Sequence, residues 1–123
     1  MGPELSFSVT RTKISDEAGY DSMSVTFSSD IAYSQFECRA TKVGADYGVG
    51  KGSLVASFSA TPALTNRTFE IYDTHLVNGD GEYRISLFAK SADTNTWNDN
   101  HPFFVSGGDG LITSDGKTFL CVR

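Results

Sequence analysis

The chain has 123 residues, of which 39% are hydrophobic and 20% charged, and its formal net charge is −5. This length suits one domain with a single hydrophobic core and excludes a two-domain enzyme. The negative charge offers no field that attracts phosphates or an anionic bilayer, which argues against nucleic acid as a partner. Insertion into a membrane is not expected either, because no apolar stretch approaches the roughly 20 residues that a membrane span needs.

Hydrophobic and polar residues alternate through the first part of the chain, a pattern that predicts half-buried β-strands. The first two strands are expected at residues 5–10 and 22–28, and the third at residues 33–40. The phase of the third strand buries Cys38. The glycine-rich residues 43–52 leave few side chains to pack and are expected to form a flexible loop.

The same alternation continues in the second part of the chain. Further strands are predicted at residues 54–60, 69–71, 83–89 and 103–105. Together with the first three they make seven short strands, a number and spacing typical of an antiparallel β-sandwich. We therefore expect an all-β fold, with residues 1–106 forming the sandwich.

Residues 107–123 are expected to form a separate C-terminal unit. They begin with a glycine-rich hinge, and Asp115 and Gly116 then lie between two apolar runs, which is a strong signal for a β-hairpin. A two-stranded hairpin is marginally stable by itself in water. The hairpin is thus expected to pack on the sandwich or on a partner chain.

The strand phases divide the aromatic residues between a core and a surface. The predicted inner positions are Phe7, Phe27, Phe36, Phe58, Phe69 and Phe103. Phe88 and Phe104 fall on the outer face of neighbouring strands, where an exposed aromatic pair indicates an interface. We favour a cover from the hairpin, through Leu111, Phe119 or Leu120, and leave open a partner protein or a homo-oligomer.

Residues 77–83, Val-Asn-Gly-Asp-Gly-Glu-Tyr, resemble the approach to strand F in fibronectin type III and related immunoglobulin-like domains. The resemblance implies a tyrosine corner, with Val77 in the aliphatic place and Tyr83 as the corner residue. Gly79 replaces the proline that is usual in this turn, and Phe27 stands where many such domains bury a tryptophan.

A narrower resemblance, over about a quarter of the chain, is to immunoglobulin-like modules of phage tail and prophage structural proteins. It rests on residues 79–89, followed by Asp93 and by Trp-Asn-Asp at residues 97–99. It implies a structural or adhesive module on a virion or extracellular surface, bound to a neighbouring protein or to the host envelope. Such a chain is made soluble in the cytoplasm and needs no signal peptide, and none is found at its start.

The sequence contains no motif typical of catalysis. Gly50 and Lys51 lack the preceding glycine and the following hydroxyl residue that a phosphate-binding P-loop requires. His75 and His101 are not accompanied by a Gly-x-Ser-x-Gly nucleophile motif. We therefore predict a protein that is not an enzyme.

A calcium site is the one cofactor alternative that the sequence leaves open, because turn residues offer oxygen ligands. The candidate ligands are either Asp80 with Glu82, or Asp93 with Asn98 and Asp99. Their spacing does not match an EF-hand, so we favour solvated turn residues and predict no cofactor.

Cys38 and Cys121 are too few and too far apart for a disulfide framework or a zinc knuckle. Two buried free thiols are the favoured state. A single bridge between them remains the alternative.

The alternative function is that of a carbohydrate-binding module, with a cell-surface glycan as its partner. Aromatic side chains in loops stack on the apolar faces of sugar rings. The candidate residues are Tyr47, Tyr72, Trp97 and His101.

Overall fold

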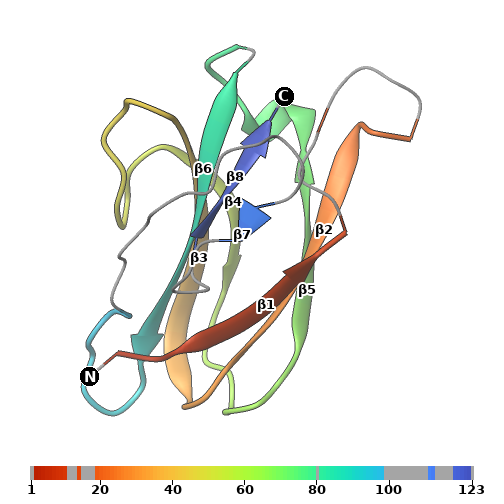
Figure 1. Cartoon of the computed structure of the whole chain (residues 1–123). Helices are drawn as coiled ribbons and strands as arrows, with labels where there is room; N and C mark the ends of the chain where they lie inside the picture. Colours follow the sequence, from red (N-terminus) through yellow and green to blue (C-terminus); the bar gives the residue numbers. More distant parts are fainter. Residues whose placement is uncertain are drawn as a thin grey trace.

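The computed structural model describes residues 2–10, 14, 19–79 and 81–98, together with the backbone of two C-terminal strands (Figure 1). The strands in these residues are β1 (Leu5–Val9), β2 (Ser22–Ser29), β3 (Tyr33–Lys42), β4 (Ser53–Phe58), β5 (Arg67–Tyr72), β6 (Glu82–Ser91), β7 (Leu111–Ile112) and β8 (Thr118–Val122). A short 3-10 turn, η1 (Asp73–His75), follows β5.

The strands form two antiparallel sheets that pack face to face (Figure 1). The smaller sheet has the order β1-β2-β5, and the larger has the order β4-β3-β6-β8-β7. The predicted all-β, sandwich-like architecture is therefore confirmed. Sequence neighbours β2 and β3 lie in different sheets, so the chain crosses between the layers at residues 30–32.

Strict alternation explains β2, in which Met23, Val25 and Phe27 are buried and the residues between them are partly exposed. Phe27 stacks on Phe36 of the opposite sheet, with 4.1 Å between ring centroids. This pair is the centre of the core between the two sheets.

The predicted inner phenylalanines are confirmed where the structure describes them. Phe27, Phe36 and Phe69 are buried, and Phe7 and Phe58 are partly buried against the core. Phe103 lies outside the described residues.

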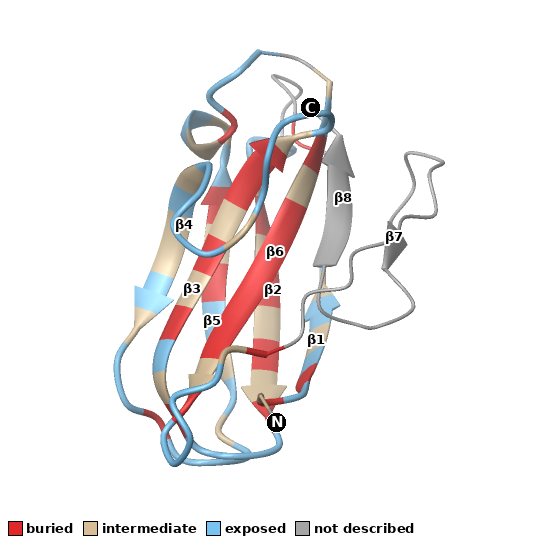
Figure 2. Ribbon diagram, turned by 90° about the vertical axis from the view of Figure 1, so that its left-hand side faces the viewer, coloured by how far each residue is buried: buried red, intermediate tan, exposed pale blue. Residues whose placement is uncertain are grey.

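Strand β6 departs from simple alternation because it is buried on both faces over most of its length (Figure 2). Leu87 belongs to the core, as its phase predicts, but Phe88 on the other face is only 2% exposed. Phe88 was expected on the outer face beneath a cover from the same chain, and its burial agrees with that expectation. The structure holds a single chain, so the chain itself covers this side chain. The alternation along a strand predicts on which face of the sheet a residue lies, but it does not predict whether that face is exposed to solvent.

The turn before β6 contains the predicted hydrogen-bonded tyrosine. Tyr83 Oη donates to the carbonyl of Gly79 at 2.5 Å and accepts the N–H of Asn78 at 2.9 Å. The aliphatic residue of this turn is Leu76, which is 4% exposed, and not Val77, which is 64% exposed. The prediction that Val77 is the buried aliphatic residue is wrong. The buried residue is Leu76, one position earlier, because the chain leaves η1 with Leu76 directed into the core.

At the other end of β6 the chain returns to the strand through Asn98. The Asn98 N–H donates to the Ala89 carbonyl at 2.8 Å, and Asn98 Oδ1 accepts the Ala89 N–H at 2.9 Å. Asn98 Nδ2 donates to the Leu87 carbonyl at 3.0 Å. One buried side chain thus takes the hydrogen-bonding place of a neighbouring strand.

The C-terminal strand β8 is hydrogen-bonded to β6, from Glu82 opposite Val122 to Ser86 opposite Thr118. β7 pairs antiparallel with β8. The sequence pattern predicts residues 107–123 as a unit apart from the sandwich, but β8 is a member of the five-stranded sheet. The strand expected at residues 103–105 and the hairpin turn at residues 113–117 lie outside the described residues.

Candidate functional site

The candidate site lies on the outer face of the five-stranded sheet, where the loop between β3 and β4 (residues 43–52) is attached to β3. Glu37 projects from this face, and its Oε2 atom accepts the Gly50 N–H at 2.9 Å. The same oxygen accepts the Arg39 Nε–H at 2.5 Å. One carboxylate therefore holds both a strand side chain and the loop backbone.

The same loop also contacts β6. The Arg84 guanidinium lies over the ring of Tyr47, 3.6 Å from its centroid, which is a close cation–π contact. Where the loop rejoins the sheet, Gly52 has a φ of +74°, and a Cβ there would lie 2.6 Å from the Ala40 carbonyl oxygen. The glycine content predicts a flexible loop, and these contacts attach its residues Tyr47 and Gly50 to the sheet.

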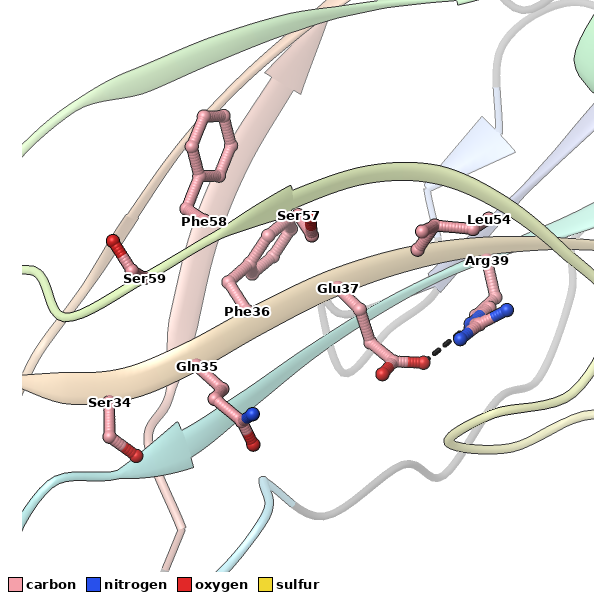
Figure 3. Close-up of a pocket in the computed structure, with 9 residues that line it drawn as sticks. All are labelled: Ser34, Gln35, Phe36, Glu37, Arg39, Leu54, Ser57, Phe58 and Ser59. Atoms are coloured by element: carbon pink, nitrogen blue, oxygen red, sulfur yellow. Dashed lines mark hydrogen bonds and ion pairs between the residues drawn. The ribbon is translucent and has the colours of Figure 1, made fainter.

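A shallow pocket of about 410 Å³ opens beside this loop (Figure 3). It is lined by Ser34, Gln35, Phe36, Glu37, Arg39, Leu54, Ser57, Phe58 and Ser59. Gln35, Glu37 and Arg39 point to the same side of β3 in Figure 3. The pocket offers hydrogen-bond donors and acceptors, and its ionised groups are already paired with each other.

Exposed apolar side chains gather on the same segment. Nine large hydrophobic side chains are exposed in the described part of the chain, and four of them lie within residues 43–54. We call this set the loop patch: Val43, Tyr47, Val49 and Leu54, between 37% and 49% exposed. These four side chains lie close together along the chain, and apolar patches that are contiguous on a surface mark interaction sites.

The predicted interface is described only in part. Phe88 is buried, and Phe104 lies outside the described residues. Leu111, Phe119 and Leu120 are described as backbone alone: Leu120 of β8 pairs with Leu111 of β7, and Phe119 pairs with Ile85 of β6. The register places Phe119 and Leu120 next to β6, and β8 separates Leu111 from it.

The predicted sugar-binding aromatics do not form one platform. Tyr47 contacts Arg84 near the start of β6, whereas Trp97 lies 5.9 Å from Lys90 Nζ near its end. Six residues of a strand separate these contacts by about 20 Å. Tyr72 is exposed on the other sheet, and His101 lies outside the described residues.

The two candidate calcium sites are each described only in part. Glu82 begins β6 and Asp93 follows its end, while both polar atoms of the Asn98 side chain already bond to the backbone. Asp80 and Asp99 lie outside the described residues. In the part of the chain that is described, no three His, Cys, Asp or Glu side chains are grouped to hold a metal ion.

Cys38 is a free thiol buried in the core. Burial raises its pKa well above the ordinary value, and the neighbouring Glu37 carboxylate adds to this effect. The thiol therefore stays protonated and unreactive at neutral pH. The side chain of Cys121 is not described.

The tethering role of Glu37 and Arg84 has no local signal in the sequence. The alternation places Glu37 on the outer face, but its partner Gly50 lies 13 residues further along the chain. A contact between residues so far apart depends on where the loop returns to the sheet.

In comparisons with known proteins, no family model, curated protein or solved structure matches this chain. Among the described residues, no helix is long and apolar enough to cross a membrane.

His75, in η1, is expected to make the stability of the protein depend on pH. Its Nδ1 accepts the Tyr72 N–H at 3.0 Å, which requires the neutral imidazole, and burial lowers its pKa from the ordinary value of 6.5. A pKa that is lower in the folded than in the unfolded protein gives stability that is complete above the unfolded pKa and lost as the pH falls through the folded pKa. The wild-type protein should therefore lose more unfolding free energy than His75→Ala between about pH 7.5 and pH 5.

Urea denaturation at a series of pH values measures this difference. The His101→Gln variant serves as the control for the second histidine. If the loss persists in His75→Ala and disappears in His101→Gln, the assignment to His75 is wrong.

Proposed function

We propose that this chain is an immunoglobulin- or fibronectin type III-like module with a structural or adhesive role, and that it binds a neighbouring protein through the loop patch. The strand order supports the family assignment. The first, second and fifth strands share one sheet and the third, sixth and last share the other, as strands A, B, E and C, F, G do in immunoglobulin-like domains. The hydrogen bonds of Tyr83 in its turn are a second supporting feature.

The observation that carries the binding role is an apolar, aromatic loop that is already attached to the sheet. Binding costs free energy when loops must be ordered, and a loop held in place reduces this cost. Glu37 holds the backbone at Gly50, and Arg84 holds the ring of Tyr47. Tyrosine is enriched at protein interfaces because its ring is apolar and its hydroxyl forms hydrogen bonds.

The proposed setting is the surface of a phage tail or prophage particle, where the partner is an adjacent particle protein or the host envelope. The support for this setting is the resemblance over residues 79–99. A module of this kind acts by attachment, so the proposal assigns it no reaction and no cofactor.

Fractionation of particles tests this function. The chain is tagged in its source organism, and the released particles are banded on a density gradient. The tagged chain is expected to band with tail proteins. A chain that stays in the soluble fraction while tail proteins band elsewhere contradicts the proposal.

Surface variants then test the loop patch. The double variant Tyr47→Ala/Val49→Ala is expected to reduce the amount of chain in the particle band at least tenfold. The matched control is Tyr20→Ala, because Tyr20 and Tyr47 are each 37% exposed and Tyr20 lies outside the loop patch. Equal incorporation of the double variant and the control would rule out the loop patch as the binding surface.

A further inference from the structure

The outer edge of β4 is an open strand edge. β4 ends the order of the five-stranded sheet, so β3 is its one neighbour in that sheet (Figure 2). Beyond the ladder to β3, the six residues of β4 make no backbone hydrogen bond with any residue that the structure describes. Alternate N–H and C=O groups of an antiparallel strand point to each side. A row of donors and acceptors therefore faces outward, and the geometry that matches it is another extended strand.

β4 lacks two common protections of an edge strand, a charged residue and a proline, although it is short and contains a bulge. Its sequence, Ser-Leu-Val-Ala-Ser-Phe, has no charged residue and no proline, whereas β5, the six-residue edge of the other sheet, carries Arg67 and Glu70. Natural edge strands are commonly protected by lysine or proline. Leu54 on this edge is 47% exposed. The single irregularity in β4 is a bulge between the positions that pair with Cys38 and Arg39.

We propose that β4 pairs antiparallel with β4 of a second copy of this chain, about a two-fold axis, so that two five-stranded sheets become continuous. A two-fold interface brings the same surface of both copies together, so the surface must complement itself. An uncharged strand meets this condition, because no like charges oppose each other even though each chain carries a net charge of −5.

The faces of β4 determine the register of this pairing. Leu54 and Ser57 pair with Arg39 and Glu37 on the outer face of the sheet. Ser53, Ala56 and Phe58 pair with the buried residues Ala40, Cys38 and Phe36, and Val55 also packs against the core. In the proposed register, outer residues of one copy lie opposite outer residues of the other, and inner residues lie opposite inner residues. Leu54 is then opposite Ser57, Ser53 is opposite Phe58, and Val55 is opposite Ala56. Each Leu54 is then covered by the partner.

The pairing uses the backbone of β4, and Leu54 is the one side chain that it shares with the loop patch. The variant for the function test, Tyr47→Ala/Val49→Ala, leaves every residue of β4 unchanged. The two proposals can therefore fail separately.

Cysteine cross-linking of the full chain tests the register. In a Cys121→Ser background, the double variant Leu54→Cys/Ser57→Cys is expected to form a covalent dimer under mild oxidation. Directly opposed residues of an antiparallel pair have Cα atoms about 4.5–5.5 Å apart, which suits a disulfide. Ser57→Cys alone should remain monomeric, because three residues separate the two cysteines by about 10 Å along the strands.

Sedimentation velocity provides the second measurement. The mass of the wild-type protein is expected to rise with concentration toward that of a dimer, and Leu54→Lys, at an exposed position, should weaken the association at least tenfold. A wild-type protein that stays monomeric overturns the proposal. So does a dimer that Leu54→Lys leaves unchanged, or a double-cysteine variant that oxidation does not cross-link.

Discussion

Replacing Phe27 with alanine is expected to lower the free energy of unfolding by about 3–5 kcal/mol. Phe27 is 1% exposed and lies at the centre of the aromatic core. Its ring stacks on Phe36 of the opposite sheet, and the rings of Tyr33, Phe58 and Phe69 lie within 6.3 Å, centroid to centroid. Loss of the ring removes buried apolar area and leaves a cavity that rigid strands on both sides cannot fill.

Denaturation with urea, followed by circular dichroism, measures this loss. Phe7→Ala is the matched control, because Phe7 pairs with Phe27 on the neighbouring strand and is only partly buried. Phe27→Leu retains an apolar side chain and should lose less stability, so it remains measurable if Phe27→Ala does not fold. A loss in Phe27→Ala no larger than that in Phe7→Ala would contradict the central position of Phe27.

Asn98→Ala is expected to reduce the unfolding free energy by about 2–4 kcal/mol, since a buried backbone group left without a partner costs about 1–3 kcal/mol. The substitution removes the partners of the Ala89 N–H and the Leu87 carbonyl. Asn98 is only 4% exposed, so water has poor access to replace these bonds.

Amide hydrogen exchange distinguishes this effect from a general loss of packing. The Ala89 N–H should exchange faster in Asn98→Ala but remain protected in Asn98→Asp, which keeps the accepting oxygen and loses the donor. Thr94→Ala, an exposed change in the same turn, should alter stability by less than about 0.5 kcal/mol. Equal stability of Asn98→Ala and Thr94→Ala would show that these bonds contribute little.

The alternation of apolar and polar residues was a reliable guide for strands whose outer face meets solvent. In β2, every predicted inner residue is buried, because one face of the strand packs on the opposite sheet and the other does not. The same reasoning placed Phe88 on the outer face but could not identify which residues cover it. Its face was predicted correctly, but that face is covered, and the cover depends on contacts that no local pattern encodes.

For the candidate site, the sequence predicts which residues are present but not which of them contact each other. The sequence indicates a glycine-rich loop with Tyr47 and an outer strand face with Glu37 and Arg39. It does not indicate that Glu37 holds the loop backbone or that Arg84 lies on the Tyr47 ring. These partners are 13 and 37 residues apart in the chain, and the pairing of β3 with β4 and β6 brings them together.

The turns show the same division between local and tertiary information. The Tyr83 hydroxyl bonds to its own turn, four and five residues away, so a local motif was sufficient to predict it. The choice between Leu76 and Val77 as the buried aliphatic residue depends on the angle at which the chain leaves η1, which the motif does not specify.

The sequence by itself determined the all-β class, most strand positions and the inner phenylalanines, because strand periodicity and turn chemistry are local properties. The tertiary structure alone decided which strands share a sheet, which outer face is covered and where the loop between β3 and β4 is attached. It also decided that the uncharged strand β4 lies at an edge, with its backbone groups open to a partner strand. The reason is physical: these features depend on pairing between distant segments, and that pairing reflects the free energy of the whole folded chain.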